Sequence, residues 1–243
     1  MNNVIKQLFN RKSTRIFTNN SISDTDKSYI IESAAMAPTA GNQQLYTIID
    51  VTDQKLKDKL SVSCDNQPFI SDAKMVLIFC ADCRKWYKAF EYAGCKPRVP
   101  DVGDLMLAVT DTAIAAQNAV TAAHSLGIGS CYIGDIMENY EIHKEMLALP
   151  DYVFPAVMIV FGYPTKQQKE REKPVRVDTE YIVHQNSYHD FDAEELKNML
   201  EYKSGENSYE SWIKKFCDRK YNSDFSIEMS RSVKKYLDEY ISK

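Results

Sequence analysis

The chain has 243 residues, of which 44% are apolar and 26% are charged, as is typical of a globular protein. Its formal net charge is −4 and its isoelectric point is about 5.7, which argues against a general nucleic-acid-binding protein. The most apolar long segment, 105–126, carries Asp111 and His124 together with two amides, so we do not expect it to span a membrane.

The N-terminal half contains a mixture of predicted helices and strands. Residues 1–10 have apolar side chains on one helical face and do not resemble a secretory signal, so we expect a cytoplasmic protein with reduced cysteines. A Ser-Asp-Thr-Asp sequence at Ser23 predicts a helix start, and Pro38 ends that helix. Further along, we expect strands over 46–51 and 74–81 and a helix over 54–61.

The C-terminal half continues the mixture. We expect a buried helix over 105–126, a short strand or turn over 131–136, a helix over 140–147 and a buried strand over 156–164. Residues 166–188 are polar and predict irregular structure. Together these elements predict an α+β fold with helices packed on one sheet, and domains over 1–188 and 189–243.

The tail from Asp192 onward has the spacing of amphipathic helices. One apolar stripe consists of Met229, Val233, Tyr236, Leu237 and Tyr240. A stripe of this kind predicts packing on the body of the protein or on a second subunit.

Several common catalytic motifs are missing from the sequence. Gly127 and Gly129 begin a dinucleotide-binding pattern, but Tyr132 occupies its third glycine position, and no Lys-Ser or Lys-Thr completes a P-loop. No G-x-S-x-G nucleophile elbow is present. Cys80 and Cys83 form a CxxC pair without a second pair at zinc-ribbon spacing, so we expect buried free thiols and no metal site.

The sequence RKSTR places the cations Arg11, Lys12 and Arg15 close together in an otherwise acidic chain. Arginine pairs bidentately with phosphate, and Ser13 adds a hydroxyl donor. In an extended segment, the alternating Arg11, Ser13 and Arg15 would point to one side, and a helix would also align the two arginines. We interpret the cluster as a site for a small anion; the alternative is a solvated charge cluster after a helix.

Other motifs follow the basic segment in a fixed order. They are APTAGNQQ at 37–44, CDNQ at 64–67, DTAIAAQN at 111–118, CYIGDI at 131–136, FGYP at 161–164 and KPVR at 173–176. Together, over about residues 5–180, they resemble the FMN-dependent nitroreductases and flavin reductases that use NAD(P)H.

The resemblance implies a set of cofactor-binding residues. The phosphate and ribityl end of FMN would be held by Arg11, Lys12, Ser13 and Arg15, with Lys173 and Arg176 closing on the same phosphate. Thr39 and Gln67 would contact FMN, and Ile133, Gly134 and Asp135 would lie along the isoalloxazine ring and offer a backbone N–H toward N5 and O4. No catalytic side chain is expected, because N5 of the flavin carries the hydride.

The sequence departs from the family pattern at three positions. Asp135 replaces a glycine of the flavin-facing turn, Val175 splits a Lys-Pro-Arg motif, and Lys12 stands where the family has arginine. A carboxylate near N5 would lower the flavin potential, unless its side chain points away from the ring.

The resemblance also implies an activity and an assembly. We expect an oxidoreductase in which NAD(P)H reduces FMN and a nitroaromatic, a quinone or a flavin reoxidises it by a ping-pong route. The family fold has a mostly antiparallel sheet in a domain-entangled homodimer. Two alternatives stay open: a relative that reduces another acceptor, such as an enone or a halogenated aromatic, and a non-catalytic flavin-binding protein with a sensing role.

Overall fold

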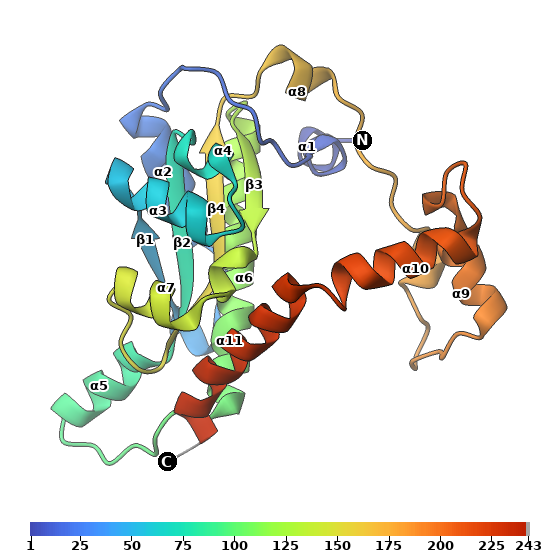
Figure 1. Ribbon diagram of the computed structural model, residues 1–243. Coiled ribbons are helices and arrows are strands. Elements are labelled where there is room, and N and C mark those ends of the chain that lie inside the picture. The colour runs from blue at the N-terminus through green and yellow to red at the C-terminus, as the bar shows by residue number, and fades with distance from the viewer. Residues whose placement is uncertain (242–243) are drawn as a thin grey trace. The chain divides into compact units, whose positions relative to one another are not determined.

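The computed structural model describes residues 1–241, and a four-stranded sheet forms its centre (Figure 1). The strands are β1 (Tyr46–Asp50), β2 (Met75–Asp82), β3 (Gly129–Ile133) and β4 (Val153–Gly162), in the order β1-β2-β4-β3. Each pair of neighbouring strands is antiparallel. The expected α+β fold with an antiparallel sheet is confirmed.

α-Helices precede, separate and follow these strands along the chain. In chain order they are α1 (Asn3–Asn10), α2 (Asp24–Ala35), α3 (Gln54–Ser63), α4 (Pro68–Ser71), α5 (Arg84–Tyr92), α6 (Val102–Ser125), α7 (Tyr140–Met146), α8 (Lys166–Glu170), α9 (Ala193–Leu200), α10 (Tyr209–Lys220) and α11 (Asp224–Ile241). The predicted start of the second helix is confirmed, because the Ser23 hydroxyl accepts a hydrogen bond from the Asp26 amide at 3.1 Å.

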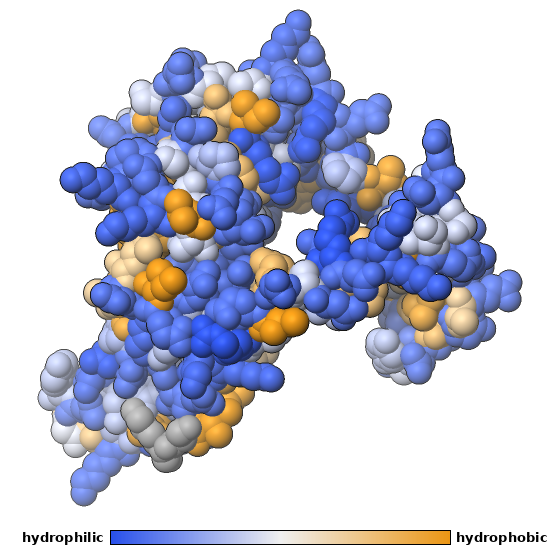
Figure 2. All heavy atoms as spheres, viewed as in Figure 1, coloured by the Kyte–Doolittle hydropathy of each residue, from blue (hydrophilic) through white to orange (hydrophobic). Residues whose placement is uncertain are grey.

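Both faces of the sheet are covered by apolar packing. Successive side chains of a strand point to opposite faces, so Leu77 and Phe79 of β2 join the cluster that contains α2 and α6, whereas Ile78 joins the cluster beneath α3 and α4. The expected buried helix is therefore α6. No helix within residues 1–241 is both long and apolar enough to cross a membrane. Hydrophilic side chains cover most of the molecular surface that Figure 2 shows.

The described chain divides into two compact units. One contains residues 1–171 and the segment from Glu228 onward, and the other contains residues 172–227 with α9 and α10. The expected domain limits of 1–188 and 189–243 stay a prediction. The expectation that 166–188 is irregular is wrong for two short stretches, α8 and a 3-10 turn at Thr179–Tyr181. Thr165 caps α8 through its side chain, a signal that the polar composition obscured.

The predicted stripe of α11 packs on the body of the protein. Tyr236 is only 1% exposed, and its ring lies edge-on to Tyr140 and Phe154 at centroid distances of 4.5 and 5.0 Å. Arg231 of α11 also pairs with Glu141 of α7 at 2.7 Å. Apolar burial and this ion pair fix the returning end of the chain to the first unit.

The N-terminal basic segment lies beside the sheet in an extended conformation. Ser13 forms a parallel bridge with Ser130 of β3, and the Thr14 amide donates to the Ser130 carbonyl at 2.9 Å. Two glycines that face each other across the β3–β4 pair, Gly129 and Gly162, make room for this segment. A Cβ atom on Gly129 would stand 2.5 Å from Thr14 Oγ1, and one on Gly162 would stand 2.7 Å from Cδ1 of Phe17.

We predict that Gly129→Ala weakens the fold by about 1–3 kcal/mol, because the new methyl group overlaps a threonine whose backbone is tied to β3. Gly103→Ala is the matched control. Gly103 lies in α6, and nothing lies within 4 Å of a Cβ placed there, so that variant should gain roughly 0.5–1 kcal/mol. Urea unfolding measures both. Equal stability of Gly129→Ala and the parent would show that the segment does not need this glycine.

Candidate functional site

In the extended basic segment, successive side chains point to opposite sides. Thr14 is buried against Gly129, whereas Ser13 and Arg15 alternate with it along the chain. Ser13 and Arg15 lie close to the buried thiol of Cys131, where burial raises the pKa of Cys131 and the two neighbours oppose that shift. Of the two geometries open to the sequence, the structure therefore has the extended one.

Both arginines of the cluster lie over aromatic rings. The Arg11 guanidinium is 5.5 Å from the ring centre of Tyr132, and that of Arg15 is 5.9 Å from the ring centre of Phe69. The Tyr132 hydroxyl is itself fixed by a 3.1 Å hydrogen bond to Oε1 of Gln117 on α6. Among residues 1–241, no carboxylate forms an ion pair with Arg15. This guanidinium can therefore receive an anionic ligand.

The end of α8 holds the same segment from the other side. The Lys12 ammonium donates to the carbonyls of Lys169, at 2.7 Å, and of Arg171. Oε1 of Gln168 accepts from the Arg15 amide at 3.2 Å, and Nη2 of Arg171 donates to the Ser13 carbonyl at 2.7 Å. Lys12 thus neutralises the C-terminal end of α8, and its contact with a cofactor stays a prediction.

Gln168 and Arg171 were missed from the sequence. They belong to a polar run, KQQKER, that resembles an ordinary surface segment. Only its position shortly after the FGYP motif could have drawn attention to it.

Two turns that are distant in sequence meet near the end of β3. Nε2 of Gln67 donates to Oδ2 of Asp135 at 3.0 Å and to the Cys64 carbonyl at 2.8 Å. Ile133 is buried, and the amides of Gly134 and Asp135 have no acceptor among the residues that the structure describes. The turn therefore presents N–H donors, while the Asp135 carboxylate is held by Gln67.

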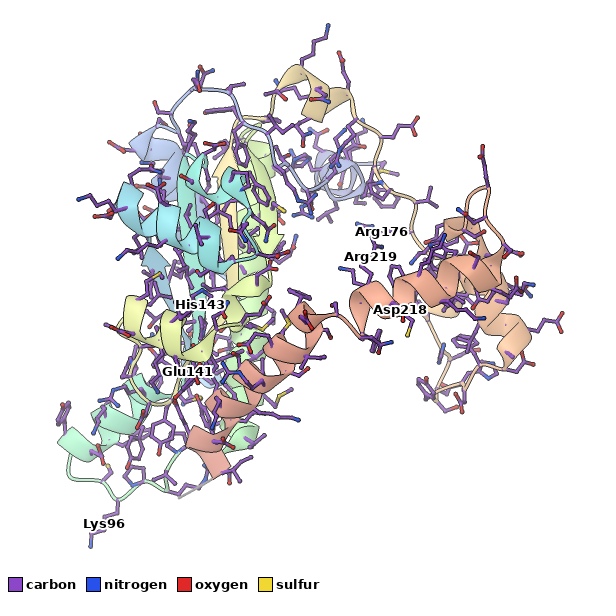
Figure 3. All side chains as sticks on the ribbon, in the orientation of Figure 1. Lys96, Glu141, His143, Arg176, Asp218 and Arg219 are labelled. Carbon is purple, nitrogen blue, oxygen red and sulfur yellow. The ribbon has the colours of Figure 1, made fainter. Side chains whose placement is uncertain are left out.

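His143 ties the same two turns together from beneath. Its ring is fully buried, and its Nδ1 lies 3.0 Å from the Ile136 carbonyl, while its Nε2 lies 2.8 Å from the Ser63 hydroxyl. Burial lowers the pKa of His143, so the neutral ring donates from Nδ1 and accepts at Nε2. Figure 3 labels His143 on α7 beside Glu141. The sequence offered no motif that singled out this histidine.

The loop that contains Thr39 is organised by the buried carboxylate of Asp111 on α6. Thr39 donates its hydroxyl proton to Oδ2 of Asp111, and the amides of Ala40 and Leu45 donate to the same carboxylate at 3.0 and 3.2 Å. Oγ1 of Thr39 accepts from the Gln44 amide at 2.8 Å. The Thr39 hydroxyl thus shapes its own loop, and its contact with FMN stays a prediction.

Lys173 and Arg176 belong to the second compact unit, which comprises residues 172–227. Arg176 is exposed and is labelled in Figure 3. Their closure on a phosphate stays a prediction.

The side chains and amides of the first unit fit a phosphorylated flavin. Arg15 and Ser13 supply a cation and a hydroxyl, the donors that bind phosphate, and the turn at Gly134 supplies N–H groups for ring heteroatoms. Within residues 1–241, no group of three or more His, Cys, Asp or Glu side chains is arranged to hold a metal ion.

Comparisons with known proteins give a consistent result. The profile of the nitroreductase family matches residues 8–163. The chain is 30% identical to the FMN reductase (NADPH) of Bacillus subtilis, over 99% of this chain and 97% of that protein. It is 33% identical to the oxygen-insensitive NADPH nitroreductase of Salmonella typhimurium, over 81% of this chain and 79% of that protein.

Solved structures agree with these sequence relatives. NfrA2 of B. megaterium matches with a TM-score of 0.80 at 31% identity, covering 97% of this chain and 98% of that one. The NfrA1 nitroreductase of B. subtilis matches with a TM-score of 0.79 at 27% identity, covering 93% and 98%. The family profile covers more than half of the chain and the Bacillus reductase nearly all of it. This chain therefore belongs to the nitroreductase family.

Proposed function

We propose that the protein is an FMN-dependent oxidoreductase that uses NAD(P)H to reduce small acceptors such as nitroaromatics, quinones or flavins. Relatives that align along most of its length are named FMN reductases and a nitroreductase. The observation that carries the proposal is that the extended basic segment pairs with β3 at Ser130, while the donor turn at Gly134 directly follows the same strand. Bound FMN would supply hydride transfer at its N5 atom.

The chain's own residues bind and orient the cofactor. Arg11, Ser13 and Arg15 would hold its phosphate. The resemblance implies that Lys173 and Arg176 contact the same phosphate, and this stays a prediction. Gln67 and the amides of Gly134 and Asp135 would contact the ring. The side-chain amide of Gln67 donates to the Asp135 carboxylate. Asp135 would therefore offer its backbone N–H, and not its side chain, to the ring.

We also propose that the protein acts in the cytoplasm as a homodimer, as expected from the resemblance. Helix α1 supports the dimer, because its apolar residues Val4, Leu8 and Phe9 are 57%, 50% and 64% exposed in the single chain. A second copy could cover such a face.

Turnover separates an enzyme from a flavin-binding protein. We expect NADPH or NADH to be oxidised in the presence of a quinone, with parallel double-reciprocal lines when both substrates are varied, as a ping-pong route requires. A protein that retains FMN but oxidises neither nucleotide with a quinone, a nitroaromatic or free FMN would contradict the enzymatic proposal.

Arg15→Ala should release FMN more readily. Loss of one charge-assisted pair costs about 1.5–3 kcal/mol, which is roughly a 10- to 150-fold rise in the dissociation constant. Arg84→Ala is the matched control, because Arg84 begins α5 and takes no part in the proposed site. Quenching of free FMN fluorescence measures both constants. If Arg15→Ala and Arg84→Ala retain FMN equally, the phosphate lies elsewhere.

A further inference from the structure

Glu138 is a buried carboxyl group that the proposed chemistry leaves unused. It directly follows the 3-10 turn Asp135–Met137, which begins at the residue proposed to face the flavin. The residue is only 6% exposed, and its Oε1 atom has no hydrogen-bond partner among the described residues. Burying a carboxylate oxygen without a hydrogen-bond partner is costly, so this position requires a physical explanation.

The charged groups around Glu138 make its ionisation more difficult. Burial, together with the nearby carboxylates of Asp135, Asp65 and Glu228, raises the pKa of Glu138 to about 7. These carboxylates come from the 3-10 turn, the turn after α3 and α11. Asp65 and Glu228 therefore each add a negative charge to that of Asp135 near Glu138.

The basic side chains on α11 and α7 near Glu138 do not neutralise it. Arg231 of α11 pairs with Glu228 at 2.8 Å and with Glu141 at 2.7 Å. His143 of α7 is neutral and is bonded to Ser63 and Ile136. No ion pair of Glu138 is found within residues 1–241, nor is any metal-binding group of side chains. Protonation of Glu138 would relieve this charge.

The surrounding backbone keeps these groups together. Asp65, Asn66 and Asn139 all have left-handed backbone angles, with φ of 62°, 51° and 52°. Residues other than glycine adopt such angles at a cost, which the neighbouring hydrogen bonds must offset. The Asn139 amide donates to Oε1 of Glu228 at 3.1 Å, and its side chain donates to the Ser63 carbonyl at 2.9 Å. Glu138 is therefore enclosed by a turn that is tied on both sides.

We propose that Glu138 is a positioning residue that takes up a proton when the flavin is reduced, and so limits the negative charge behind the flavin-facing turn. The inference rests on the proposed function. A hydride adds negative charge to the oxidised ring, and that charge favours the protonated form of a carboxyl group nearby. The proton comes from solvent and stays on the Glu138 carboxyl; no bond to the cofactor is formed. At high pH the ionised carboxylate would oppose reduction.

The test compares flavin midpoint potentials of the FMN-loaded parent and Glu138→Gln by equilibration with a reference dye. At pH of about 5.5 both side chains are neutral, and the potentials should agree. At pH of about 8.5 the variant should favour the reduced flavin roughly tenfold more than the parent, which is ~30 mV for a two-electron couple. Glu145→Gln is the matched control: it removes an exposed carboxylate from the neighbouring helix α7 and should follow the parent at both pH values.

Infrared difference spectra give a second readout that a purely structural role would not change. Reduction of the parent near pH 8 should produce a protonated-carboxyl band that is missing in Glu138→Gln. A parent–variant difference that is the same at both pH values, together with no such band, would overturn the inference. A protein that binds no FMN would instead contradict the proposed function, so the two failures are distinguishable.

The pH dependence of the unfolding free energy gives a further check on Glu138→Gln. A carboxyl whose pKa is raised in the folded state stabilises the fold below its unfolded pKa, and this contribution is lost as the pH rises through about 7. Glu138→Gln should therefore have a higher urea midpoint than the parent near pH 8. A lower midpoint there would show that the carboxylate is paired, and would also overturn the inference.

Discussion

The seating of Thr14 and Phe17 on two facing glycines is the constraint on which the candidate site depends. Gly129 and Gly162 are register partners of β3 and β4, and side chains at either position would collide with the N-terminal segment. Because Thr14 must point into the sheet, its neighbours Ser13 and Arg15 must point away from it. The packing of Thr14 against Gly129 thereby sets the direction of the charged Arg15 side chain.

Other contacts fix this arrangement in space. The end of α8 holds Ser13, Lys12 and the Arg15 backbone, and the pair formed by Gln67 and Asp135 places the donor turn at the end of the same strand. Reduction of a flavin increases negative charge on its ring, so donors fixed in advance favour the reduced form. In this account the fixed donors of the fold stabilise the reduced flavin, and no catalytic acid or base is needed.

Much of the fold could be predicted from sequence patterns. The apolar runs of β2 and β4 and the apolar length of α6 indicated buried elements, and Ser23 marked a helix start. Proximity between distant residues was harder to predict. Nothing in the pattern indicated that His143 would contact Ser63, or that Gln168 and Arg171 would hold the basic segment, because their partners lie more than seventy residues away.

The candidate site was predictable mainly where motifs were contiguous. The alternation of Arg11, Ser13 and Arg15 predicted a common side, and the extended segment has that alternation. The side chain of Asp135 could not be oriented from sequence, since its direction depends on Gln67. For Lys12 and Thr39 the structure shows contacts within the protein that residue type alone did not reveal.

The most direct test of the central claim is the visible absorbance spectrum of the purified protein, recorded without oxygen before and after NADPH is added. We predict a two-banded flavin spectrum that bleaches on addition, because hydride from the nucleotide reduces bound FMN. A colourless protein that takes up no added FMN would contradict the assignment of the basic segment and the turn at Gly134 as a flavin site.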